Sequence, residues 1–391
     1  VGFDAPELFR APLRLDELSA VVRVEPTGDG LVLDAPRVHA RNADLAARGR
    51  VRVETARGRP PELDLQFAYR DGDPDAAPKY LPAHIMPPKV VAWLDQAFRG
   101  GRLAQGSFTM RGRSDDFPFR GHEGVFDVRA DVAGVTLHYA DGWPVIEDLH
   151  GRLHFAGPGL SVRADSGVSR GVDLREGLAR IPDLRDGDLS VDVVAHGPVD
   201  GMLGVVNDSP LAARFAPVFG DARGRGEATL ALDLAIPVKD VDATRVNGEL
   251  TLAGAGLEQP AHDLAFSGID GRVRFSERSV NIDGLTAVLR GRPLRLDAAT
   301  RNDIAYFRAT GDFALPELVP ALADGPLAGS TGRSAWDVVL RVPLGDGAPA
   351  RLEAESDLLG TRIDLPRPLA KPADSARAVR LEMPLTGADA R

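Results

Sequence analysis

The stretch Glu147-Asp148-Leu149-His150-Gly151-Arg152-Leu153-His154-Phe155 decides the fold, because related versions of it recur along the chain. One version, near the N-terminus, reads Asp16-Glu17-Leu18-Ser19-Ala20-Val21-Val22-Arg23-Val24. Another reads Ser267-Gly268-Ile269-Asp270-Gly271-Arg272-Val273-Arg274-Phe275, and its Gly271 lies 120 residues after Gly151. Each version is followed by a turn and a second alternating strand. Self-similarity at such spacing indicates a stacked array whose unit is a large multi-stranded module.

The bulk composition limits the classes of partner and of site. The 391 residues carry a net charge of −10, which argues against a nucleic-acid partner, because that would need a basic surface. With 43% hydrophobic but only 6% aromatic residues, the chain can build a core that is mainly aliphatic. The absence of cysteine excludes disulfides, zinc-thiolate sites and a cysteine nucleophile.

Strict alternation of apolar and charged residues predicts many half-buried strands. The clearest segments are residues 62–70, 125–132, 189–193, 228–236 and 335–343. Helical signals are few. The best runs from Tyr80 to Phe98, with Pro87 and Pro88 suited to a first turn and Gly100-Gly101 as its stop. Weaker helical signals cover residues 209–219 and 316–323.

Three short helices cannot cover the apolar sides of so many strands. Either the sheets pack on each other as a sandwich, or one sheet curls into a groove whose apolar face meets something other than protein. No apolar run of about 18 residues is present to span a membrane as a helix. The elements repeat in the same order along the chain. Each unit has strands, then a short helix, then a Gly-rich turn and a long alternating strand. We therefore expect β-groove repeat units at residues 1–79, 80–220 and 221–372, and a C-terminal tail at 373–391.

Several short motifs, in order, resemble the periplasmic AsmA-like superfamily and its YhdP-type branch. They are Tyr80-Leu81-Pro82, Trp93-Leu94-Asp95, Asp116-Phe117-Pro118-Phe119, Gly142-Trp143-Pro144 and Pro368-Leu369-Ala370-Lys371-Pro372. The resemblance covers residues 11–372. It implies a mainly β protein with an elongated, curled antiparallel sheet that forms a hydrophobic groove, and with a few short α-helices. We read the chain as a piece of a longer protein whose N-terminal inner-membrane anchor lies outside it.

The resemblance also implies a function. We expect a segment of a bridge-like protein in the Gram-negative periplasm, in which a groove shields phospholipid acyl chains between the inner and outer membranes. The parts that reach either membrane would lie outside this segment. We expect no cofactor, no metal site, no nucleic-acid partner and no enzymatic activity. The residues expected to line the groove are Phe126, Val128, Val132, Val191, Val193, Leu230, Leu232, Leu234, Val273 and Phe275.

Two alternatives remain open at this stage, and a third is excluded by strand geometry. The same strands could enclose a protein-filled core in a structural array that serves outer-membrane assembly or integrity without carrying lipid. Trp93 and Leu94 could gate the groove, although packing on the sheet is favoured. His150 and His154 have the spacing of metal ligands on a helix, but on a strand they lie about 13 Å apart and cannot share a metal ion.

Overall fold

The computed structural model describes residues 1–385 except 5, 8, 211, 213–219, 261–262, 319–328 and 345–348. The chain forms two compact units. Unit 1 comprises Val1–Ala195 and Asp233–Thr244, and unit 2 comprises His196–Leu232 and Arg245–Arg391. Strands account for 61% of the residues and helices for 10%, in antiparallel sheet that is not closed into a barrel. The predicted mainly β, antiparallel class with few short helices is therefore confirmed.

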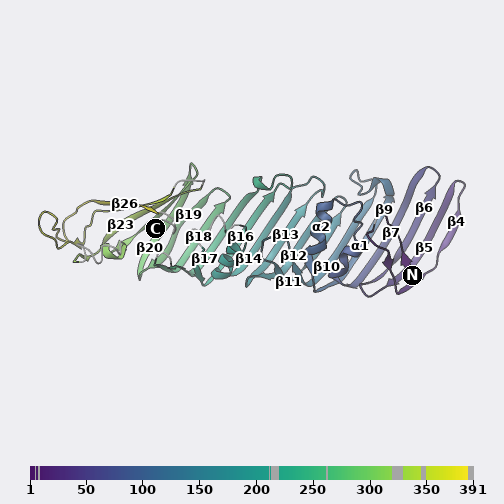
Figure 1. The fold of residues 1–391 in the computed structure, drawn as a ribbon, viewed down its shortest axis with the longest axis horizontal. Coiled ribbons are helices and arrows are strands. Elements are labelled where there is room, and N and C mark those ends of the chain that lie inside the picture. Colours follow the sequence, from purple (N-terminus) through teal and green to yellow (C-terminus); the bar gives the residue numbers. More distant parts are fainter. Residues whose placement is uncertain are drawn as a thin grey trace. The chain divides into compact units, whose positions relative to one another are not determined.

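Unit 1 contains long strands joined mostly by tight turns (Figure 1). Its strands are β1 (Gly2–Phe3), β2 (Leu13–Arg14), β3 (Glu17–Ala20), β4 (Arg23–Pro26), β5 (Gly30–Arg41), β6 (Ala46–Ala56), β7 (Arg59–Gly72), β8 (Phe98–Arg99), β9 (Arg102–Arg113), β10 (Val125–Leu137), β11 (Ile146–Ala156), β12 (Gly159–Ser169) and β13 (Val172–Ile181). Its helical segments are η1 (Pro74–Ala76), α1 (Ala77–Tyr80), α2 (Pro88–Ala97), η2 (Ser114–Asp116) and η3 (Val241–Ala243).

Unit 2 is built in the same way. Its strands are β15 (Arg223–Arg225), β17 (Arg245–Gln259), β18 (Leu264–Ser276), β19 (Val280–Leu289), β20 (Arg292–Arg301), β21 (Ile304–Phe313), β22 (Thr331–Gly332), β23 (Ser334–Pro343), β24 (Ala350–Ser356), β25 (Thr361–Arg362) and β26 (Val379–Leu385). Its described helices are α3 (Val199–Asn207) and α5 (Leu315–Leu318). Strands β14 (Leu189–Pro198) and β16 (Glu227–Ile236) contribute residues to both units.

The predicted helical regions are partly realised. The predicted helix from Tyr80 to Phe98 is shorter in the structure: α1 ends at Tyr80, and α2 covers Pro88–Ala97. Proline has no backbone N–H and suits the first turn of a helix, so α2 begins at Pro88 and not earlier. The helix α5 covers the start of the predicted segment 316–323, whose remainder lies outside the described residues. Most of the predicted segment 209–219 also lies outside them, and the helix described nearby is α3.

The sheet register aligns apolar residues in rows across successive strands. Each residue of a row is the direct cross-strand partner of the next, so all of them lie on one face. In unit 1 one row runs through β5, β6, β7, β9, β10, β11, β12 and β13 as Val38, Gly49, Phe67, Phe108, Val128, Phe155, Leu160 and Ile181. In unit 2 one row runs through β17, β18, β19, β20, β21, β23, β24 and β26 as Leu250, Val273, Ile282, Ala298, Phe307, Leu340, Leu352 and Met383.

A β-bulge recurs with the same 120-residue offset that the sequence shows. Strand β10 starts at Val125 and β17 at Arg245. In β10 the register shifts between Val132 and Val135, and in β17 it shifts between Leu252 and Ala255. Gly134 (φ 68°) and Gly254 (φ 63°) take up the extra residue in the left-handed region, which glycine adopts without a steric cost. The two halves therefore share internal geometry as well as sequence.

A buried lysine holds the connection between β24 and β26. Lys371 is 2% exposed, and its Nζ donates to the carbonyl oxygens of Leu358 (2.7 Å), Thr361 (2.8 Å) and Pro372 (3.1 Å). Its three N–H donors are thus matched by three acceptors, as a buried ammonium requires. Leu358 and Ile363, in the same connection, are buried in the core of unit 2.

A loop between β9 and β10 is fixed in a different way, by an ion pair at its surface. Arg120 donates from Nε and Nη2 to the carboxylate of Asp183, at 2.8 and 3.0 Å. Hydrogen bonding from the Arg120 side chain, with a further hydrogen bond from the backbone N–H of Arg185, lowers the pKa of the Asp183 carboxyl from 3.8 to about 2. The pair ties the loop that carries Phe117 and Phe119 to the segment after β13.

Replacing Lys371 by methionine should destabilise unit 2 by roughly 2–3 kcal/mol, because two buried carbonyl groups and one partly buried carbonyl group lose their donor. Urea unfolding followed by the fluorescence of Trp336, the tryptophan of unit 2, measures this effect. Arg362→Met, which removes an exposed cation paired with Asp364 in the same connection, is the matched control and should change stability little. Equal stability of Lys371→Met and the unmodified protein would contradict the assigned role.

Asp183→Asn should lower the free energy of unfolding at pH 7 by less than about 1 kcal/mol, because the ion pair is partly solvated. Since the folded-state pKa of Asp183 is depressed, its contribution is present above pH 3.8 and is lost as the pH falls towards about 2. The stability difference between variant and unmodified protein should therefore shrink in acid. Urea titrations at several pH values, with Asp188→Asn as the control in the same loop, test this. A difference that stays constant down to pH 2 would exclude the mechanism.

Candidate functional site

In each unit the long strands form a sheet with one apolar face and one charged face, as the alternation of apolar and charged residues predicts. On β10, Asp127, Arg129 and Asp131 lie opposite to Phe126, Val128 and Ala130. The charged face carries cross-strand ion pairs such as Arg50 with Asp64 and Arg152 with Asp131, both at 2.7 Å. The hydrogen bond from Arg152 lowers the pKa of the Asp131 carboxyl. Such pairs suit a face in contact with water.

The two histidines lie on the charged face with separate partners. His154 Nε2 is 2.8 Å from Asp127 Oδ2, and His150 Nε2 is 3.3 Å from Asp148 Oδ1. Their spacing along β11 keeps them apart. In the part of the chain that the structure describes, no group of three or more His, Asp or Glu side chains could hold a metal ion. We therefore find no chemistry to assign to His150 and His154.

The ten residues expected to line a groove are all half-buried apolar side chains. The structure does not gather them into one site. Phe126, Val128, Val132, Val191, Val193 and Leu234 belong to unit 1, and Leu230, Leu232, Val273 and Phe275 belong to unit 2. Whether they contact a ligand remains a prediction.

Part of the apolar face of unit 1 is covered by helix α2 (Figure 1). Ala97, fully buried, packs in a cluster with Leu137 and Leu149, while Leu94 packs with Phe155 and Leu160. Phe126 and Val128 border the second of these clusters, and Val193 borders the first. Packing of Leu94 on the sheet, which the sequence favoured over gating, is what the structure shows.

The helix α2 is fastened beside the sheet by polar contacts. Trp93 Nε1 donates to the Tyr139 carbonyl oxygen at 3.1 Å. Arg10 forms a bidentate pair with Asp95, at 3.0 and 2.9 Å. These contacts orient the apolar side of the helix towards β10–β12.

The apolar face of unit 2 is covered by other segments. Val199 of α3, with Met202 and Leu203 beside it, packs into the core cluster that also contains Leu358 and Ile363. Val273 borders the same cluster. Phe275 is directly opposite Gly248, and a Cβ atom there would lie 2.2 Å from the Phe275 ring. The glycine therefore lets the ring lie flat across the neighbouring strand.

A different section of the apolar face, on β6, β7 and β9, was missed by the sequence-based selection. We call it the open apolar section. All of its side chains are half-buried, and none belongs to the core clusters of the described residues. It consists of Val51, Val53, Leu63, Leu65, Phe67, Phe108 and Met110. The alternation of Leu63, Leu65 and Phe67 was visible in the sequence, but nothing there distinguished covered from uncovered strands.

A line of phenylalanine rings runs from the open apolar section to the loop after β9. Ring centroids lie 6.5 Å apart for Phe67 and Phe108, 6.3 Å for Phe108 and Phe126, and 5.0 Å for Phe126 and Phe117. Phe117 in turn lies 6.4 Å from Phe119, which is buried. The rings meet at tilted or edge-to-face angles, the preferred geometry for aromatic pairs.

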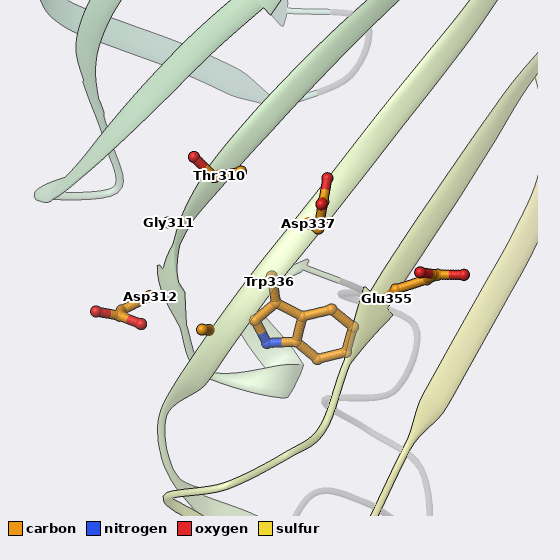
Figure 2. Close-up of a pocket in the computed structure, with 7 residues that line it drawn as sticks. Thr310, Gly311, Asp312, Trp336, Asp337 and Glu355 are labelled. Carbon is orange, nitrogen blue, oxygen red and sulfur yellow. The ribbon is translucent and has the colours of Figure 1, made fainter.

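A pocket on β21, β23 and β24 of unit 2 lies among charged side chains (Figure 2). Thr310, Asp337 and Glu355 are successive cross-strand partners and so share the charged face. Asp337 is hydrogen-bonded to Arg308 Nε at 2.8 Å, and Glu355 pairs with Arg380 at 3.2 Å. Both carboxylates are thus engaged in surface ion pairs, and the pocket offers no arrangement for acid–base or nucleophilic chemistry.

Among the described residues, no helix is long and apolar enough to cross a membrane. The sequence profile of the family described as "YhdP protein" matches residues 1–390. The chain is 25% identical over 384 residues to the "Intermembrane phospholipid transporter YhdP" of Escherichia coli (strain K12). That alignment covers 96% of this chain but 30% of the relative, so the chain spans under a third of the relative's length. No solved structure matches the chain. The chain belongs to the YhdP protein family.

Proposed function

We propose that this chain is a segment of a protein that shields phospholipid acyl chains on an apolar sheet face, on their way between the inner and outer membranes of a Gram-negative envelope. The observation that carries the proposal is the alignment of apolar residues in unbroken rows across eight successive strands of each unit. The relative described as an intermembrane phospholipid transporter supports the same class of ligand.

The chemistry of the rows suits a hydrocarbon chain. Aliphatic and aromatic side chains bind by excluding water, at about 25 cal/mol per Å² of apolar surface, without fixed direction. A chain that must move along the face gains from contacts that do not change as it slides. The charged face, with its paired Arg and Asp side chains, keeps the other side of the sheet solvated. In this role the segment would be periplasmic and would have no catalytic step.

The alternative is a structural array with a protein-filled core. The specific observation in its favour is the cover over part of each apolar face, by α2 in unit 1 and by α3 with the Leu358–Ile363 segment in unit 2. The half-buried state of the ten expected groove residues and of the open apolar section favours the lipid-shielding function instead.

Photoreactive residues at Phe126, Leu232 and Phe275 should yield phospholipid adducts when the protein is irradiated in cells and analysed by mass spectrometry. All three side chains are half-buried apolar groups, so a bound acyl chain would come within reach of the probe. A probe at Ala231, the exposed neighbour of Leu232 on the opposite face of β16, is the control. Adducts to protein alone from all three positions of a folded protein would favour the structural array.

Leu232→Asp should reduce the phospholipid that co-purifies with the protein, with a modest loss of stability, because a carboxylate on a half-exposed face keeps part of its hydration. In a closed core the same charge would be desolvated, and the cost of several kcal/mol would unfold the unit. Ala231→Asp is the matched control. Phospholipid analysis and urea unfolding of the two variants distinguish the functions; unchanged lipid content in a folded Leu232→Asp variant would contradict a lipid path at this position.

A further inference from the structure

The open apolar section of unit 1 ends at the strands that helix α2 covers. Phe67 and Phe108 are cross-strand partners, Val128 follows Phe108, and Phe155 follows Val128 in the same row. Phe67 and Phe108 are half-buried, whereas Phe155 is 8% exposed and packs with Leu94 of α2. One row of the sheet therefore passes from an uncovered to a covered state within a few strands.

The boundary is reinforced by side chains from the loop after β9. Phe117 packs edge-on against Phe126, and Phe119 lies behind it with 3% exposure. The adjoining Arg120 is clamped to Asp183 by two hydrogen bonds. Phe117, Phe119 and α2 thus form an ordered edge to the open apolar section.

The open apolar section offers its ligand no hydrogen bond from its own side chains, because all seven are apolar. Tyr69, the next residue on this face of β7, donates its hydroxyl to the Arg129 carbonyl oxygen at 2.5 Å, with its ring over Gly106. Burial, with the nearby charge of Asp131, raises the pKa of Tyr69 to about 12, so this hydroxyl stays a donor to that carbonyl. A peptide or sugar would leave polar groups unpaired here, whereas a hydrocarbon chain would not.

We infer that the open apolar section of unit 1 is a discrete binding site for a phospholipid acyl chain, and that α2 is its end wall. This inference rests on the proposed function and adds a location to it. The rigid rings of Phe67, Phe108 and Phe126 give the site its platform, and Val51, Val53, Leu63, Leu65 and Met110 complete it. Movement of lipid past Phe155 requires displacement of α2 from its contacts with Tyr139 and Arg10.

The test uses three phenylalanines of one register row, so that the probe and its sheet environment are matched. Phe67, Phe108 and Phe155 are replaced singly by a diazirine-bearing phenylalanine in the full chain, which is purified, incubated with phosphatidylethanolamine vesicles and irradiated. Lipid adducts at positions 67 and 108 should exceed those at 155 by about tenfold or more, because a chain reaching Phe155 must first displace buried Leu94. At position 155 the expected adducts are to residues of α2.

Equal lipid labelling at Phe155 and Phe67 would contradict the role of α2 as an end wall. The proposal that the chain shields lipid would still stand. Lipid adducts at Phe275 or Leu232 but not at Phe67 or Phe108 would overturn the site and leave the proposed function standing. An absence of lipid adducts at every position of a folded protein would overturn both.

A second measurement does not depend on the probe. The double variant Phe67→Gln/Phe108→Gln should lose bound phospholipid in native mass spectrometry, whereas Arg50→Gln on the charged face should retain it. Lipid retention in the folded double variant would also overturn the site.

Discussion

The whole structure depends on which residues of each strand point to the apolar face and which to the charged face. Successive side chains of a strand point to opposite faces, so a slip of one residue would move every apolar group to the charged face. Apolar residues of β10 sit at even positions up to Val132 and at odd positions from Val135 onward. The bulge at Gly134 absorbs the extra residue and returns Val135, which is fully buried, to the apolar side. The same correction occurs at Gly254 in β17 of unit 2.

Much of this architecture was readable from sequence because it is local. Alternation in segments such as 125–132 and 228–236 predicts both the strand and the face of each residue, and the recurrence of Gly151 as Gly271 predicts the repeated hairpin. The phase change at Gly134 was not predicted, because one glycine in an alternating run does not reveal its φ angle. Lys371 lies in the Pro-rich stretch 365–372, where the sequence indicates loop and does not show that the lysine is buried. Its burial depends on carbonyl groups of Leu358 and Thr361, which only the folded connection brings together.

The division of the apolar face into covered and uncovered sections was equally beyond the sequence. The apolar stripe of Val90, Trp93, Leu94 and Ala97 in the sequence indicates that a helix there buries one side, but not on which strands. In the structure, helix α2 packs on Leu137, Leu149, Phe155 and Leu160, which lie some 40 to 70 residues further along the chain. The selection of Phe126 and Val128 from alternation alone therefore named residues at the border of the covered section. The adjoining strands β6, β7 and β9 carry half-buried apolar side chains that belong to no core cluster of the described residues.

Covering only part of an apolar face resolves a conflict that any lipid-shielding sheet must meet. Apolar surface that is left open promotes aggregation, while apolar surface that is fully buried cannot bind a ligand. In unit 1 the conflict is met by confining the open residues to a few strands and closing the rest with a helix fixed by Trp93 and Asp95. The tethers of α2 are polar and few, whereas its apolar contacts are many, so the strength of the cover is set mainly by Leu94 and Ala97. A helix held in this way competes for the sheet with the same kind of contact that an acyl chain would make. The proposed lipid binding and the closure of the core would therefore rest on the same apolar contact, made at different strands.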